Sequence, residues 1–214
     1  MVVLDQHVTV HSARKIQAMR PKFWDLTRDG ADPVSHRWKP VYERVRTATD
    51  NTVVATVVGS GADLMLQLTE NCPEPFAILY VLVVPRRTQP GRYQLKEWMD
   101  RESLVAYLER YRAYLEGDGR HNLWVKCGDD SLIVYDRHET LYLYGDLDGF
   151  IKVLEHVGYG PGEVRVDFPH EHHYNYEYDG DEQSIVNSGD YTRFDLVPGQ
   201  DIERDDPRIP VTDL

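Results

Sequence analysis

The chain has 214 residues, of which 41% are apolar and 11% aromatic, and it carries a formal net charge of −12 at pH 7. This length and composition suffice for one domain with a hydrophobic core, and they exclude a wholly disordered chain. The acidic balance argues against nucleic acid as a partner, and no apolar run approaches the roughly 20 residues of a membrane span, so we expect a soluble, cytoplasmic protein without a membrane partner.

The N-terminal residues 1–50 predict a helical extension. Ser12 can cap a helix there, although Pro21 interrupts the pattern unless a second helix begins near it. The inward positions of this helix would be Ile16, Met19, Phe23 and Leu26. We therefore separate this extension from a core domain at residues 51–180.

The core domain begins with two runs of β-branched and aromatic residues, Thr52–Val58 and Phe76–Val84. Runs without polar alternation predict strands that are buried on both faces. Between them, Ser60 can cap a short helix. The segment after the second run is rich in proline and arginine and predicts a loop.

Two longer helices follow from the apolar spacing. Asp100 can cap a helix over residues 101–116, and Asp146 can cap another that ends before Gly158. The apolar stripe of the first helix recurs at helical spacing, and it consists of Leu104, Tyr107, Leu108, Tyr111 and Leu115.

Three short apolar segments, 122–127, 132–136 and 141–144, are joined by polar connections of hairpin length, which predicts an antiparallel meander. A further strand is predicted at Glu163–Phe168. This order predicts the α+β class: a single domain with a mixed, mostly antiparallel sheet and helices packed on one face. The meander is expected to supply much of the core, through Leu123, Val125, Ile133, Val134, Leu141 and Leu143.

The last quarter of the chain holds most of the charge. Residues 161–214 contain 14 acidic and four basic residues, and the prolines beyond residue 180 predict an extended acidic wrap over residues 181–214. Tyrosines within a field of carboxylates have the composition of a protein interface. We therefore predict a non-enzymatic binding protein, of the inhibitor or immunity type, that engages a basic protein partner through Tyr174, Tyr176, Glu177, Tyr178, Asp179, Asp181 and Glu182.

A group of histidines suggests an alternative function. In an extended backbone His170 and His172 point to the same side, and Asp136 and His138 alternate in the same way at the tip of a predicted hairpin. If the two pairs face each other, these four residues form a site suited to Zn²⁺, Mn²⁺ or Fe²⁺.

The alternative is therefore a metal-dependent hydrolase, in which Glu171 or His173 would act as a general base for a metal-bound water. Since no complete catalytic motif is present, the binding function is favoured. No cofactor is predicted, and a divalent transition metal enters only with the alternative.

The sequence Gly59-Ser60-Gly61 lies between a predicted strand and a predicted helix, where a phosphate-binding turn would be found. Neither the dinucleotide nor the Walker pattern is complete around it. It therefore predicts a tight turn with a capping serine.

Cys72 and Cys127 are far apart in the sequence and fit no metal or redox spacing. They predict two reduced thiols, as expected for a cytoplasmic protein. Asp118 and Arg120 can pair across the turn between a helix and the meander, which contributes about 0–1 kcal/mol if the pair is exposed.

Overall fold

The computed structural model describes residues 21–26, 34–46 and 51–201. Every neighbouring pair in its main sheet is antiparallel except β10 and β3, which are parallel. The order across this sheet is β10 (Gly160–Pro161), β3 (Val41–Arg46), β4 (Asn51–Thr56), β9 (Thr140–Tyr144), β8 (Ser131–Tyr135), β7 (His121–Cys127), β5 (Phe76–Leu82), β6 (Gly91–Leu95) and β12 (Tyr191–Phe194). The predicted α+β class, the mixed sheet and the meander of β7, β8 and β9 are confirmed.

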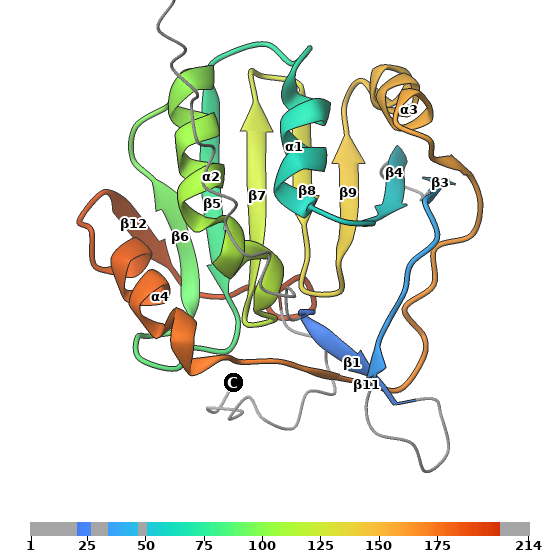
Figure 1. Cartoon of the computed structure of the whole chain (residues 1–214). Coiled ribbons are helices and arrows are strands. Elements are labelled where there is room, and N and C mark those ends of the chain that lie inside the picture. The colour runs from blue at the N-terminus through green and yellow to red at the C-terminus, as the bar shows by residue number, and fades with distance from the viewer. Residues whose placement is uncertain (1–20, 27–33, 47–50, 202–214) are drawn as a thin grey trace, which may run out of the picture.

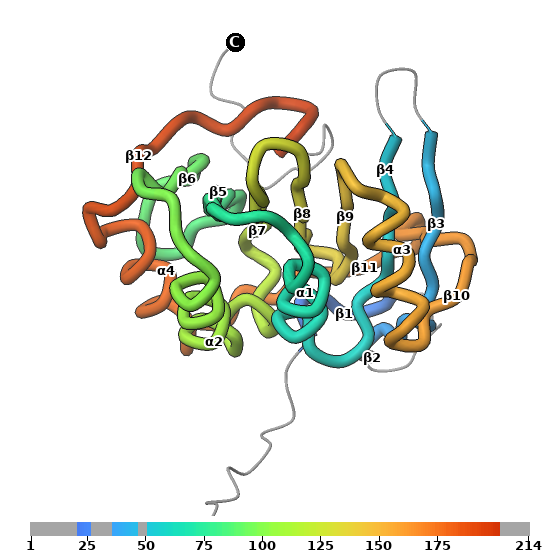
Figure 2. The backbone as a smooth tube through the Cα atoms, turned by 90° about the horizontal axis from the view of Figure 1, so that it is seen from above, coloured from blue at the N-terminus to red at the C-terminus, as the bar shows by residue number. Residues whose placement is uncertain are grey.

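Helices cover one face of this sheet, as predicted (Figure 1, Figure 2). They are α1 (Gly61–Thr69), α2 (Arg101–Gly117), α3 (Leu147–His156) and α4 (Asp179–Val186). The segment 195–201 runs along the opposite face, where Asp201 Oδ2 lies 3.6 Å from Arg92 Nε. Among the described residues, no helix combines the length and apolar character needed to span a membrane.

The core lies between the sheet and the helices. Apolar residues recur at helical spacing on the helices and at every second position on β7, so each element turns its apolar side to the other layer. The side chain of Asp100 accepts a hydrogen bond from the Ser103 amide (2.8 Å) and caps α2. The apolar stripe of that helix and the alternate, inward residues of β7 belong to one buried cluster, with Tyr107 at its edge. The enclosed core includes the predicted Leu123, Val125, Ile133, Leu141 and Leu143, while Val134, 7% exposed, lies outside this cluster.

A second, three-stranded antiparallel sheet lies beside the ends of β8 and β9 (Figure 1). Its order is β11 (His170–His172), β1 (Phe23–Asp25) and β2 (Val34–Ser35). Phe23 pairs with His172 and Asp25 pairs with His170. This small sheet therefore carries two of the predicted metal ligands to the end of the main sheet.

The prediction of an N-terminal helix is wrong for the part that the structure describes. Phe23, one of its inward positions, lies in strand β1, because Pro21 interrupts a helix here and β11 offers a ladder partner. Ser12, Ile16 and Met19 lie outside the described residues. Strand β3, also within residues 1–50, joins the main sheet through β4.

Three further predictions need correction. Residues 163–168 alternate in exposure but form no strand. The Gly162 amide still donates to Tyr42 O (2.9 Å), but beyond it the described part of the chain offers no ladder partner. The loop predicted after β5 contains β6. The described part of the predicted extended wrap contains most of α4 and all of β12, because β6 leaves an edge that β12 pairs with.

Candidate metal centre

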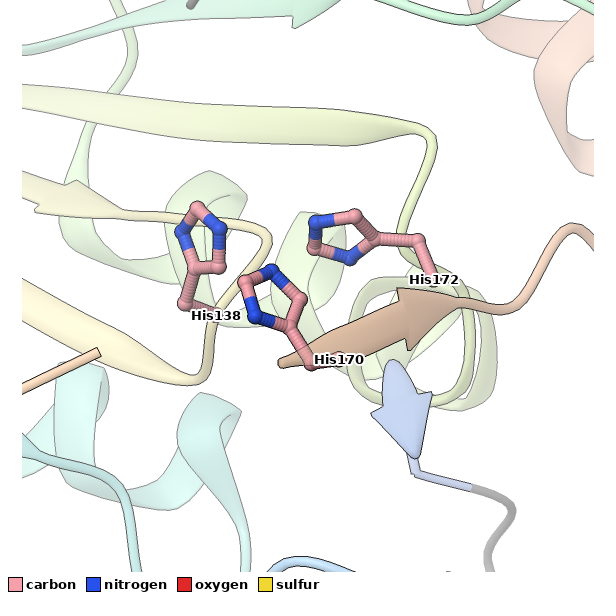
Figure 3. A group of neighbouring side chains, drawn as sticks. All are labelled: His138, His170 and His172. Carbon is pink, nitrogen blue, oxygen red and sulfur yellow. The ribbon is translucent and has the colours of Figure 1, made fainter. Parts of the chain in front are cut away.

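Three histidine side chains converge at the end of the main sheet (Figure 3). His138 lies in the turn between β8 and β9, and His170 and His172 lie on one face of β11 because strand residues two apart point the same way. One ring nitrogen from each of the three lies within 4.8 Å of the others. The ring centroids are 4.9 to 5.1 Å apart.

Asp136 does not belong to this ligand group, in contrast to the four-ligand prediction, but it orients one member. Its Oδ1 accepts hydrogen bonds from the amides of His138 (2.8 Å) and Thr140 (3.0 Å), and its Oδ2 lies 3.0 Å from His138 Nδ1. Burial opposes ionisation of Asp136, but His138 and these hydrogen bonds outweigh it and lower the pKa of the carboxyl group. The carboxylate therefore leaves Nε2 of His138 as the nitrogen that can bind a metal.

His170 is oriented in the same manner. Its Nδ1 lies 2.9 Å from the backbone carbonyl oxygen of Phe168, an acceptor, so this nitrogen carries the proton. Nε2 is then the ring nitrogen that could bind a metal. Carboxylate or carbonyl acceptors behind ligating imidazoles are the usual outer contacts of protein metal sites.

His172 has a different neighbour. The Arg137 guanidinium donates through Nε to His172 Nε2 (2.9 Å) and through Nη2 to the Tyr174 hydroxyl (3.3 Å). A metal ion that used Nε2 of His172 would displace this arginine, so metal binding and the position of the Arg137 side chain are coupled.

The sequence reasoning missed the surroundings of the site. The ring of Phe23 lies 5.5 Å from His170, 6.2 Å from His172 and 6.4 Å from His138, measured between centroids. Phe168 stacks on His36 at 4.3 Å. The two phenylalanine rings therefore border the cluster. Phe168 stands two residues before His170 in the sequence, whereas the position of Phe23 followed only from the pairing of β1 with β11.

A buried lysine lies on the other side of the β8–β9 turn. Lys22 Nζ donates to the carbonyl oxygen of Asp136 (2.9 Å) and lies 3.6 Å from the centroid of the Tyr135 ring. Burial lowers the pKa of Lys22 to about 8, although Asp136 and Glu139 favour its charged form. The lysine thus ties β1 to the turn that carries His138.

The two predicted general bases do not face the cluster. Glu171 is exposed on the opposite side of β11 from its two neighbours. The ring of His173 packs against Trp24, with centroids 4.4 Å apart. Neither residue is therefore placed to act as a general base for a water at the cluster.

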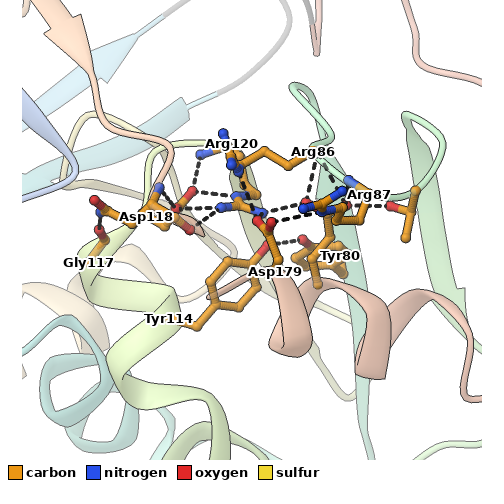
Figure 4. A network of polar contacts seen from close by, with 11 residues as sticks. Tyr80, Arg86, Arg87, Tyr114, Gly117, Asp118, Arg120 and Asp179 are labelled. Atoms are coloured by element: carbon orange, nitrogen blue, oxygen red, sulfur yellow. Dashed lines mark hydrogen bonds and ion pairs between the residues drawn. The ribbon is translucent and has the colours of Figure 1, made fainter. Parts of the chain in front are cut away.

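The predicted acidic surface is largely tied into the fold (Figure 4). Asp179 pairs with Arg86 (2.8 Å), Arg87 (3.1 Å) and Arg120 (3.1 Å). Glu182 is fully buried and pairs with Arg120 at 2.5 Å. Burial alone would raise the pKa of Glu182. Hydrogen bonds from the amides of Arg87 and Arg86 and from the Arg120 guanidinium have the larger effect, so the pKa of Glu182 is lowered.

The other predicted interface residues divide between packed and exposed. Tyr178 packs against Tyr114, with ring centroids 5.8 Å apart, Tyr174 accepts the bond from Arg137, and Asp181 is half-buried. Tyr176, 75% exposed, and its exposed neighbour Glu177 face solvent.

Asp118 and Arg120 pair as the sequence suggested, but in a different environment. Both side chains are fully buried, and Arg120 Nε donates to Asp118 Oδ1 at 2.7 Å. The small contribution expected of an exposed pair therefore does not apply here. Buried charges lose their hydration and must be compensated by ion pairs and hydrogen bonds within the protein.

The turn at Gly59-Ser60-Gly61 is a capped helix start, as predicted. Ser60 Oγ accepts from the Asp63 amide (3.0 Å). The carboxylate of Glu116 accepts from Ser60 Oγ (2.6 Å) and from the Ala62 amide (2.9 Å). The Glu116 carboxylate thus occupies the N-terminus of α1, the position where a bound anion such as phosphate would lie.

Comparisons of the chain with protein-family models, with curated proteins and with solved structures found no match.

Proposed function

We propose that the protein binds a divalent transition metal through His138, His170 and His172, and that this centre supports hydrolysis. The observation that carries the proposal is the convergence of three imidazole nitrogens within 4.8 Å. In a tetrahedral zinc site, bonds of about 2.0–2.1 Å place ligand nitrogens roughly 3.4 Å apart. Small rotations of the three rings would close this difference.

The donor set also agrees with this chemistry. Imidazole nitrogens suit zinc, copper, iron and nickel. Three protein ligands leave the fourth tetrahedral position for a water, whose pKa a bound zinc ion lowers towards neutrality. Asp136 would hold His138 in the ligating orientation, and Arg137, released from His172, would place a positive charge beside the centre.

The test begins with metal content. Full-length protein without an affinity tag is stripped with a chelator, and Zn²⁺ binding is measured by titration calorimetry. One ion per chain is expected, and His138→Ala, His170→Ala or His172→Ala should each abolish tight binding. His156→Ala is the control, because His156 is exposed on α3 and outside the cluster. Equal binding by the cluster variants would refute the site.

Hydrolysis is tested separately on the metal-loaded protein, with chromogenic carboxylic and phosphoric esters as probes. Turnover that depends on the metal and disappears in His170→Ala supports the hydrolase. Stoichiometric metal without turnover would leave a metal-binding protein and remove the enzymatic part of the proposal.

Binding of a basic protein partner is a second proposal, supported by the exposed pair Tyr176 and Glu177. Fewer carboxylates support this proposal than the sequence suggested, because Asp179 and Glu182 already pair with arginines of the same chain. Salt-sensitive capture of a basic protein that is lost in the double variant Tyr176→Ala with Glu177→Gln would establish it.

The proposed location is the cytoplasm. Cys72 and Cys127 are both free thiols, and reduced thiols are typical of that compartment. Localisation of the tagged full-length chain by fractionation tests this point.

A further inference from the structure

A cleft of about 710 Å³ lies between α1 and α3, away from the histidine cluster. Its size is typical of small-molecule sites. Cys72, which follows α1, is half-buried and lines this cleft. A small reagent that enters the cleft therefore meets this residue.

The second cysteine of the chain lies directly behind the first. Cys127 is the last residue of β7 and is fully buried. The Gly128 amide donates to the carbonyl oxygen of Pro75 (2.9 Å), so the segment after Cys72 runs along the end of β7. Cys72 packs against the buried cluster to which Cys127 belongs. The two thiols donate to backbone carbonyl oxygens of their own segments, Cys72 to Leu68 (3.3 Å) and Cys127 to Val125 (3.8 Å).

The surroundings distinguish the two sulfurs. The Arg101 guanidinium is fixed beside Cys72, since it donates to the carbonyl oxygens of Thr69 (2.8 Å) and Cys72 (3.0 Å). The interaction of Cys72 with Cys127 and the charge of Arg101 lower the pKa of the Cys72 thiol, against the opposing effects of burial and Asp146. The interaction with Cys72 and burial raise the pKa of the Cys127 thiol.

We propose that Cys72 is a site of oxidation by peroxides that enter the cleft, and that Cys127 resolves the product as an intramolecular disulfide. The inference does not depend on the metal centre. A half-buried thiol in a cleft, a buried thiol in the cluster behind it and a fixed guanidinium support it, and such surroundings are expected of a reactive cysteine.

The chemistry has two steps. The Cys72 thiolate attacks one peroxide oxygen, the O–O bond breaks, and protonation of the leaving oxygen gives water (from hydrogen peroxide) and a sulfenic acid on Cys72. The Cys127 sulfur then attacks the Cys72 sulfur. The S–S bond forms, the S–O bond breaks, and the hydroxyl group leaves as water with the thiol proton. The peroxide is the oxidant, and it is reduced as the two thiols are oxidised.

The test uses the reduced full-length protein, with a chelator present to exclude metal effects. Samples are treated with hydrogen peroxide, blocked with an alkylating reagent and mapped by peptide mass spectrometry. We expect a Cys72–Cys127 disulfide within one chain. In the untreated protein, Cys72 should be alkylated at least about tenfold faster than Cys127, because exposure and thiolate character govern reactivity.

Variants separate the two roles. In Cys127→Ala, Cys72 should accumulate sulfenic acid that dimedone traps; in Cys72→Ala, Cys127 should stay unmodified. If Cys127→Ala does not unfold cooperatively, Cys127→Val fills the same core position. Disulfide-linked dimers without the internal disulfide, or alkylation of Cys127 as fast as Cys72, would overturn the proposal.

Discussion

Asp136 acts on the candidate metal centre through His138, whose Nδ1 it holds at 3.0 Å. Asp136→Asn keeps an oxygen for the amides of the turn but removes the carboxylate behind the imidazole. We expect Zn²⁺ affinity to fall by roughly 10- to 100-fold, as is usual for such outer partners.

The matched control for this substitution is Asp167→Asn, on an exposed carboxylate before β11. Titration calorimetry compares both variants with the native protein. An unchanged Zn²⁺ affinity in Asp136→Asn would show that the carboxylate stabilises the β8–β9 turn and does not act on the metal centre.

The His121 side chain is buried at the start of β7. It is fully enclosed, and among the residues that the structure describes neither ring nitrogen has a hydrogen-bond partner. The centroid of its ring lies 4.4 Å from that of Tyr114 and 5.3 Å from that of Tyr80. Burial, together with the charges of Lys22 and Arg120, lowers the pKa of His121 well below its usual value. The residue is therefore neutral in the folded protein.

His121→Phe should stabilise the protein or leave its stability unchanged at pH 8, because an unsatisfied buried polar group costs about 1–3 kcal/mol. Below pH 6.5, His121 binds a proton in the unfolded state but stays neutral in the folded state. The native protein therefore loses stability as the pH falls through this range. The free energy of unfolding of His121→Phe should fall less than that of the native protein over the same pH range.

Urea unfolding at pH 8 and pH 5.5 measures both effects. His156→Phe, on an exposed histidine of α3, controls for the loss of a histidine as such. An equal loss of stability in His121→Phe and the native protein would contradict the assignment.

At the scale of elements, α2 contributes its stripe to the core. Leu108 is fully buried, whereas Val105 on the same helix is 38% exposed. Leu108→Ala should lower the free energy of unfolding by about 2–5 kcal/mol, the usual cost of a buried leucine. Val105→Ala should change it by less than about 1 kcal/mol, and similar losses in both variants would argue against this packing.

Arg120 links α4 to the start of β7. Its guanidinium donates to Asp118 (2.7 Å), Asp179 (3.1 Å) and Glu182 (2.5 Å) (Figure 4). Arg120→Met leaves these carboxylates buried or partly buried without their shared cation, which should cost about 3–5 kcal/mol.

Arg165→Met is the comparison, because Arg165 pairs with Glu163 in solvent at 2.5 Å and an exposed pair contributes about 0–1 kcal/mol. Chemical unfolding of both variants decides the question. A loss below about 1 kcal/mol in Arg120→Met would mean that α4 can be released without disturbing the core.

In the whole molecule, the histidine cluster joins the small sheet to the main sheet. His170 and His172 belong to β11, and His138 belongs to the turn between β8 and β9. A metal bound to all three would stabilise the folded chain by about 2.7 kcal/mol at a free concentration 100 times its dissociation constant.

Removal of the metal with a chelator should therefore lower the unfolding free energy and speed amide exchange in β1 and β11. The variant with alanine at all three histidines should show no response to the metal. A metal effect that persists in that variant would place the binding elsewhere.

The residue patterns determined the fold class, because apolar spacing reports which face of a helix or strand is buried. The stripe of α2, its cap at Asp100 and the alternation on β7 all follow from local rules. The same reasoning placed His170 and His172 on one side of an extended segment.

Only the tertiary structure decided what surrounds these residues. It brought Phe23 and Lys22 next to the turn of His138, moved Asp136 behind an imidazole, and paired Asp179 and Glu182 with arginines of distant loops. Burial and pairing depend on contacts between segments far apart in the chain. Composition can therefore show where acidic residues are concentrated, but not whether their charges remain available to a partner.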